Sequence, residues 1–163
     1  MLNIQNLRET DHKILIIGSV QPTIVQSVLD FDYLSGKKEP SVKGLLVAIS
    51  GKRTERYFWG DKEILLPRFK SYDAIPKEIS DSLTLFLNMN SGRRVRQSTS
   101  EVFSKLPNIL GGVIFAENVP EKQAIEIYEL TKKSEKFVIG PASVGLLLPG
   151  ILKLGPIGGL TAD

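Results

Sequence analysis

Residues 14–29 read ILIIGSVQPTIVQSVL, and this stretch decides the fold class. Four consecutive aliphatic residues at 14–17 predict a buried strand that ends at Gly18. Pro22 suits the first turn of a helix, and apolar residues recur after it at helical spacing, at positions 24, 25, 28 and 29. A buried strand followed directly by an amphipathic helix is the repeating unit of a parallel sheet.

The same alternation continues along the chain. Further strands are predicted at 44–49, 64–66, 83–87, 112–116 and 137–139, and further helices at 72–79, 93–106 and 120–133. Residues 51–60 are predicted to be a polar excursion that ends on aromatic residues, and a hairpin is predicted around 148–151. We therefore expect an α/β, Rossmann-like, doubly wound fold, with a mainly parallel sheet and helices on both faces. Residues 1–145 would form this domain, and 146–163 a C-terminal hairpin or linker toward a second domain.

Composition excludes several kinds of chemistry. The 163 residues contain no cysteine and one histidine, His12, so neither a thiolate site, a histidine-pair metal site nor a Ser-His triad is expected. The net charge of +3 is mild and lacks the dense basic stripe of a nucleic-acid surface. No apolar run approaches the ~18 residues of a membrane span, and the first residues do not resemble a signal peptide. We expect a cytoplasmic protein without a nucleic-acid or membrane partner.

The junction after the first predicted strand is a candidate phosphate-binding position, because a helix begins there. Only Gly18 of a GxGxxG fingerprint is present, so the sequence does not predict NAD binding. The side chains of Ser19, Gln21 and Thr23 could contact a phosphate or a pantetheine group. Capping of the helix by the same residues is the alternative.

Lys52 follows the second predicted strand, in the sequence Ser50-Gly51-Lys52-Arg53. The stretch is not a Walker motif, because Leu46 stands where the first glycine would be and Arg53 replaces the hydroxyl residue. Lys52 could still face a phosphate at the carboxyl end of the sheet, or it could lie in a solvated loop.

Asn90, Ser91 and Arg93 follow another predicted strand and open another helix. They could bind a phosphate or a ribose, since arginine offers a two-pronged donor. The alternative is that Ser91 caps the helix and the arginines are exposed. The predicted helix start carries three cations, Arg93, Arg94 and Arg96, although the helix dipole disfavours cations there. An anionic ligand or partner is therefore favoured at this position.

The most distinctive stretch is residues 28–67, VLDFDYLSGKKEPSVKGLLVAISGKRTERYFWGDKEILLP. Asp30 and Asp32 lie two residues apart, so on a helix they would not share a face as an acid–base pair would, and we interpret this segment as structural or interface-forming. With the motifs VLDFDY, EPSV, LNMNSGR and VIFAENVP, the chain resembles the CoA-binding domain of the succinyl-CoA synthetase α-subunit superfamily. Within that superfamily it is most similar to ATP-citrate lyase and citryl-CoA synthetase.

The resemblance implies a role for each candidate residue. In such enzymes ATP phosphorylates a histidine, the phosphate passes to citrate, and CoA attacks citryl-phosphate to give citryl-CoA. CoA is therefore the implied cofactor. By position, the resemblance implies that the first CoA loop is lined by Ser19, Gln21 and Thr23, the second by Lys52, and the nucleotide end by Asn90, Ser91 and Arg93.

The resemblance also implies partners. The phosphorylated histidine of the family lies in a second α-type domain, and this sequence stops before it at Asp163, so we expect the chain to be inactive alone and to hold no catalytic residue. The implied partners are that second domain, an ATP-grasp (β-type) subunit or region, and a citryl-CoA lyase module or separate lyase. The alternative function is a non-catalytic module for CoA or nucleotide binding or for subunit assembly.

Overall fold

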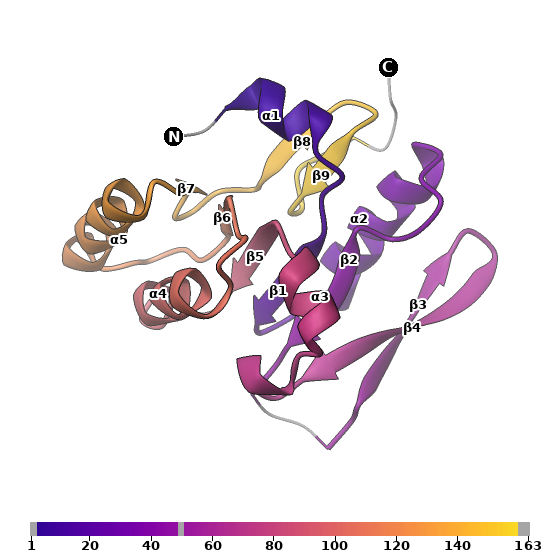
Figure 1. Ribbon diagram of the computed structural model, residues 1–163, viewed down its shortest axis with the longest axis horizontal. Coiled ribbons are helices and arrows are strands. Elements are labelled where there is room, and N and C mark those ends of the chain that lie inside the picture. The colour runs from indigo at the N-terminus through magenta and orange to yellow at the C-terminus, as the bar shows by residue number, and fades with distance from the viewer. Residues whose placement is uncertain (1–2, 49–50, 160–163) are drawn as a thin grey trace.

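The protein is a mainly parallel seven-stranded sheet with helices on both faces and one added hairpin, and its computed structural model describes residues 3–48 and 51–159 (Figure 1). In chain order the elements are α1 (Ile4–Glu9), β1 (Ile14–Gly18), α2 (Pro22–Leu34), β2 (Val42–Leu46), β3 (Thr54–Trp59), β4 (Lys62–Phe69), η1 (Tyr72–Ala74), α3 (Lys77–Ser82), β5 (Leu85–Met89), α4 (Val95–Lys105), β6 (Gly111–Ile114), α5 (Glu121–Ser134), β7 (Phe137–Ile139), β8 (Leu146–Leu148) and β9 (Leu152–Leu154). The sheet order is β3-β4-β2-β1-β5-β6-β7, and only the β3–β4 pair is antiparallel. The expected fold class is confirmed.

The two faces of β1 belong to two different hydrophobic cores. Ile14 and Ile16 pack with the inner face of α2, whereas Leu15 and Ile17 pack with α4 and α5. Side chains alternate along a strand, so an uninterrupted aliphatic run supplies both cores at once. Figure 1 shows α4 and α5 together on one side of the molecule and α2 on the other.

The strand order reverses at β1, and this reversal positions the candidate site. From β1 the chain passes through α2 to β2 on one side, and it later returns to place β5 on the other side of β1. The loop after β1 leads to α2 on one face, and the loop after β5 leads to α4 on the opposite face. In open α/β sheets a crevice forms at the carboxyl ends of two such strands.

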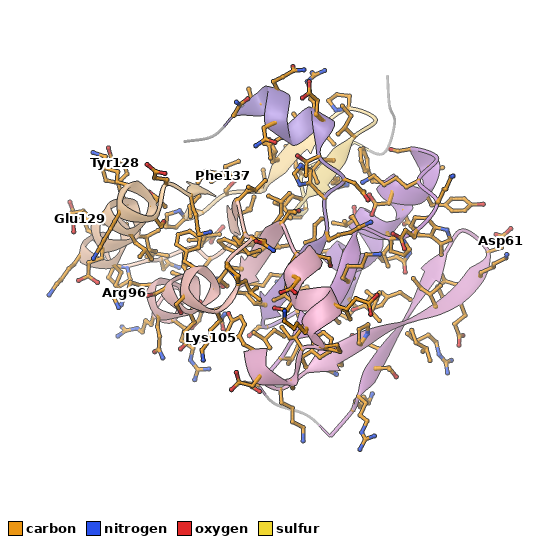
Figure 2. The ribbon with its side chains drawn as sticks, in the orientation of Figure 1. Asp61, Arg96, Lys105, Tyr128, Glu129 and Phe137 are labelled. Carbon is orange, nitrogen blue, oxygen red and sulfur yellow. The ribbon has the colours of Figure 1, made fainter. Side chains whose placement is uncertain are left out.

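The prediction of a polar excursion at 51–60 is wrong for most of that segment, because residues Thr54–Trp59 form β3. This strand pairs along its length with β4, which is longer than the predicted 64–66. Only one face of β3 is covered, with Tyr57 buried and its neighbours Arg56 and Phe58 exposed, so the strand lacks an aliphatic run such as that of β1. The hairpin projects away from the rest of the sheet, with Asp61 at its tip (Figure 2).

Several element boundaries also differ from expectation. Helix α4 begins at Val95 rather than at Arg93, and its N-cap is Arg94 rather than Ser91, with no side-chain cap bond. The helix predicted at 72–79 is divided into η1 and α3, and the short α1 was not predicted at all. The strand predicted at 44–49 is β2, and its expected end at Ile49 lies outside the described residues.

The expected hairpin near residue 150 is present as β8 and β9, and it packs against α2. Leu148, Leu152 and Leu154 join the same core as α2, together with Leu7 of α1. The Lys153 ammonium is buried there and donates to the hydroxyl of Ser27 on α2 at 2.7 Å. Within 3–48 and 51–159, the helices are too short or too polar to cross a bilayer.

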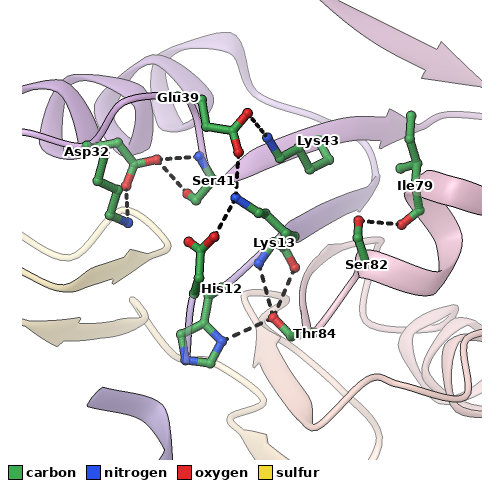
Figure 3. A network of polar contacts seen from close by, with 11 residues as sticks. His12, Lys13, Asp32, Glu39, Ser41, Lys43, Ile79, Ser82 and Thr84 are labelled. Atoms are coloured by element: carbon green, nitrogen blue, oxygen red, sulfur yellow. Dashed lines mark hydrogen bonds and ion pairs between the residues drawn. The ribbon is translucent and has the colours of Figure 1, made fainter. Parts of the chain in front are cut away.

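A polar network closes the opposite, amino-terminal end of the parallel strands (Figure 3). The buried Asp32 carboxylate lies 2.6 Å from the Lys37 ammonium and accepts from both the backbone N–H and the hydroxyl of Ser41, at 2.8 and 2.5 Å. Asp32 is therefore structural, as expected. The buried His12 ring contacts the Leu7 carbonyl at 2.9 Å and the Thr84 hydroxyl at 3.1 Å.

Candidate functional site

A cavity of about 780 Å³ opens at the carboxyl ends of β1, β2 and β5. Its walls come from the segments after four strands and from the first turns of α4. The lining includes Gly18 and Ser19 after β1, Val47 and Ala48 after β2, Lys70, Ser71 and Tyr72 after β4, Asn90 after β5, and Arg94, Gln97, Ser98 and Glu101 of the α4 region. This size and position are typical of a ligand site in a doubly wound fold.

Gly18 brings two of these walls into direct contact. Its φ of +99° lies in a region that disfavours residues with a side chain. A Cβ atom at this position would lie 2.6 Å from the backbone nitrogen of Asn90 and 2.7 Å from its Cγ. Glycine at the end of β1 is therefore required for the close approach of the loops after β1 and β5, although the fuller glycine fingerprint is absent.

Asn88 lies on strand β5, beside the central strand β1, and its side chain is fully buried. Its Oδ1 accepts from the backbone N–H of Asn90 at 3.1 Å and from the Asn90 side-chain amide at 3.0 Å. Its Nδ2 donates to the hydroxyls of Ser98 at 2.8 Å and Thr99 at 3.2 Å. One amide thus connects the loop after β5 to helix α4.

The charged groups of the cavity favour an anionic or polar ligand. Lys70 and Arg94 contribute two cations, and Glu101 is the single carboxylate among the described lining residues. Burial, followed by the nearby Glu101 charge, raises the pKa of the Tyr72 phenol well above its usual value, so Tyr72 stays a hydrogen-bond donor at neutral pH. Together these groups can bind and orient a ligand carrying phosphates.

Acid–base or metal chemistry finds little support in the same region. The described lining contains no histidine and one carboxylate, so it offers no pair of carboxylates. Across residues 3–48 and 51–159, no cluster of three or more histidine or acidic side chains is placed to hold a metal ion.

The structure brings two of the seven sequence-predicted residues, Ser19 and Asn90, into the cavity lining. Gln21 is the N-cap of α2 but makes no side-chain capping bond, and Thr23 is exposed in the first turn of that helix. Both are near the loop after β1 without lining this cavity. Lys52 is exposed between β2 and β3, and Ser91 is exposed after β5.

Arg93 lies in a second, smaller hollow of about 350 Å³ between the starts of α4 and α5. It shares this hollow with Lys122 and with Arg96, whose guanidinium pairs with Glu126 at 2.9 Å. Gln97 lines both hollows, so the second adjoins the main cavity. Arg93 and Arg94 thus mark the two sides of a single helix start.

Most of the lining residues were not predicted as site residues, among them Lys70, Tyr72, Arg94 and Gln97. Lys70 and Tyr72 follow β4, which lies beside β2 although the two strands are separated by β3 in the chain. The predicted strand at 64–66 ended three residues too early, and Lys70-Ser71 directly follows the observed end of β4 at Phe69. Arg94 was within one residue of a predicted position.

Comparison with known proteins shows which family the chain belongs to. No protein-family model matches the sequence. A probable ATP-citrate synthase subunit 1 of Neurospora crassa is 38% identical over 146 residues, which cover 88% of this chain, and human ATP-citrate synthase is 34% identical over 150 residues, or 91% of this chain. The chain is homologous to one segment of the ATP-citrate synthases. It spans 21% of the length of the Neurospora protein and 13% of the human one.

Two solved structures agree with this assignment. The ATP citrate lyase of Methanothrix soehngenii, in complex with citrate and coenzyme A, superposes with a TM-score of 0.80 and 32% identity. A mutant ATP citrate lyase of Methanosaeta concilii, in complex with (3S)-citryl-CoA, superposes with a TM-score of 0.80 and 30% identity. In both cases the match covers 89% of this chain and 23% of the other.

Proposed function

We propose that this chain is the CoA-binding module of an ATP-citrate lyase or citryl-CoA synthetase. CoA would occupy the cavity at the carboxyl ends of β1, β2 and β5. The observation that carries the proposal is a cavity of about 780 Å³ at the strand-order reversal. It lies in a segment homologous to lyases solved with CoA or citryl-CoA bound.

The cations around the cavity would hold the phosphates of CoA. Arg94 and Lys70 line the cavity, and Arg93 lies across the same helix start. Since arginine binds phosphate through two parallel hydrogen bonds, Arg94 is the strongest single candidate inside the cavity. The neighbouring Arg93, which the resemblance assigns to the nucleotide end of CoA, would act from the adjoining hollow.

The neutral groups would fix the rest of the ligand. Ser19 and Asn90 line the contact between the loops after β1 and β5, and their hydroxyl and amide can donate to or accept from a phosphate, ribose or pantetheine. The phenol of Tyr72 adds a donor from the segment after β4. Gln21, Thr23, Lys52 and Ser91 remain proposed contacts around the rim.

The contribution to the reaction would be one of orientation. Holding CoA with its thiol toward an acyl-phosphate turns the attack into an effectively intramolecular step, which is a large part of catalysis in such ligases. The acyl-phosphate would be formed by other parts of the enzyme, namely an ATP-grasp region and a second α-type domain. Release of acetyl-CoA and oxaloacetate would fall to a citryl-CoA lyase module.

Calorimetric titration of the chain with CoA tests the binding proposal. CoA should bind at one site. The variant Arg94→Ala should bind at least tenfold more weakly, because it loses a charge-assisted pair with phosphate. Dephospho-CoA, which lacks one phosphate, should bind more weakly than CoA to the wild type.

The matched control is Arg56→Ala on the projecting β3–β4 hairpin. Arg56 is exposed, pairs with Glu63 at 3.1 Å, and lies on the edge strand β3 opposite Leu65, outside the cavity lining. Its removal should leave CoA affinity within twofold of the wild type. Absence of heat with both CoA and dephospho-CoA would overturn the proposal and leave a role in subunit assembly as the better account.

A further inference from the structure

The side-chain amide of Asn88 has every hydrogen-bonding position filled. Its oxygen accepts twice from Asn90, and its nitrogen donates once to Ser98 and once to Thr99. An amide oxygen has two lone pairs and an amide nitrogen two hydrogens, so no capacity is left unused. A fully satisfied buried polar group fixes its neighbours in one arrangement.

Three of the groups held in this way belong to the cavity wall, although Asn88 itself is not part of the lining. Asn90 and Ser98 are held directly. Arg94 is held through Ser98, whose hydroxyl also lies 3.0 Å from the Arg94 carbonyl and donates to it. The wall after β5 and the wall at the start of α4 therefore depend on one buried side chain.

The position of Asn90 also determines the third wall. Because the backbone and side chain of Asn90 fill the space next to Gly18, any shift of Asn90 changes the contact with the loop after β1. Helix α4 has no side-chain cap of its own at Arg94. The bonds from Asn88 to Ser98 and Thr99 connect the start of this helix to β5.

We propose that Asn88 is a positioning residue for the CoA site. It presets Asn90 and Arg94 for the ligand without touching the ligand, and the inference rests on the proposed CoA-binding function. Without the Asn88 amide, Asn90 and the first turn of α4 would be less constrained. CoA binding would then have to order them, and this entropic cost would weaken the affinity.

The test combines a measurement without ligand and one with CoA. In Asn88→Leu, which keeps the approximate volume and removes all four hydrogen bonds, amide hydrogen exchange at Asn90 should be at least tenfold faster than in the wild type. The Kd for CoA should rise at least tenfold. The milder variant Thr99→Val, which removes one acceptor of Asn88 outside the cavity, should change both quantities in the same direction by about twofold to fivefold.

Ser41→Ala is the control for a general loss of stability. It removes a hydroxyl bond to the buried Asp32 at the opposite end of the sheet. This variant should be less stable, yet its Kd for CoA and its relative exchange rate at Asn90 should stay within twofold of wild-type values. A merely structural role for Asn88 would make Asn88→Leu behave in the same way as Ser41→Ala.

The outcomes separate this inference from the proposed function. If the wild type binds CoA and Asn88→Leu binds equally well, the positioning role is refuted and the CoA site stands. If the wild type does not bind CoA, the CoA site is refuted. Unchanged exchange at Asn90 in Asn88→Leu would then refute the positioning role independently.

Discussion

Replacing Gly18 with alanine should destabilise the fold and also damage the candidate site. Positive φ at residues with a side chain costs about 1–2 kcal/mol. At Gly18 the new Cβ would also lie 2.6 Å from the backbone nitrogen of Asn90, which cannot move aside as a flexible side chain would. Overpacking of this kind adds about 1–3 kcal/mol, so we expect a total loss of about 2–5 kcal/mol in the free energy of unfolding.

Gly36 separates the two contributions. It has a φ of +76°, but a Cβ there would meet no atom within 4 Å. Gly36→Ala should therefore show only the backbone cost, and the difference between the two variants should be the clash with Asn90. Urea denaturation gives both free energies, and calorimetry gives the Kd for CoA, which should rise only in Gly18→Ala. Equal destabilisation by the two variants, with unchanged CoA binding in both, would refute this reasoning.

Three further predictions concern the network at the opposite end of the sheet. Asp32→Ala should cost about 3–5 kcal/mol of unfolding free energy in urea denaturation, because it leaves the Lys37 ammonium without its buried partner. The control Asp30→Ala, two residues earlier, should cost about 1 kcal/mol. Equal losses in the two variants would contradict this prediction. Burial lowers the pKa of His12 from 6.5, so the unfolded chain takes up a proton before the folded one, and stability should fall between pH 7 and pH 5 by at most about 1.4 kcal/mol per pH unit. His12→Asn should flatten that slope in pH-dependent denaturation, and an unchanged slope would assign it to other groups. Hydrogen bonds from two lysines lower the pKa of Glu39 from 4.5 to about 2. The ionised Glu39 therefore stabilises the folded state above pH 4.5, and this stabilisation is lost toward pH 2. Over that range of an acid titration, Glu39→Gln should lose less stability than the wild type.

The fold class could be predicted because the strands carry their own signal. In β1 every residue of the aliphatic run is buried, so composition alone distinguishes it from a surface strand. In β3 only Tyr57 is buried, and the strand mixes charged residues (Glu55 and Arg56) with aromatic ones, so the same reasoning predicted a loop. Helix α1 buries only Leu7 across six residues, which is too weak a pattern to detect.

The candidate site could be predicted only in part, since a sequence does not state which strand ends are neighbours. Ser19 and Asn90 directly follow β1 and β5, the two strands at the reversal, so the general rule for these folds found them. Lys70 lines the cavity because β4 lies beside β2, an order that no local pattern encodes. Arg94 rather than Arg93 lines the cavity because α4 starts two residues later than predicted, and helix boundaries are the least certain feature of such predictions.

The most direct test of the central claim is the location of CoA on the chain. Titration of isotopically labelled protein with CoA, followed by the backbone amide chemical shifts, measures that location. We predict that the shifts change at Gly18, Ser19, Tyr72, Asn90 and Arg94, while the amides of the Asp32 and Ser41 network stay unchanged. Shift changes centred on that opposite network, or no change at all at saturating CoA, would contradict the account.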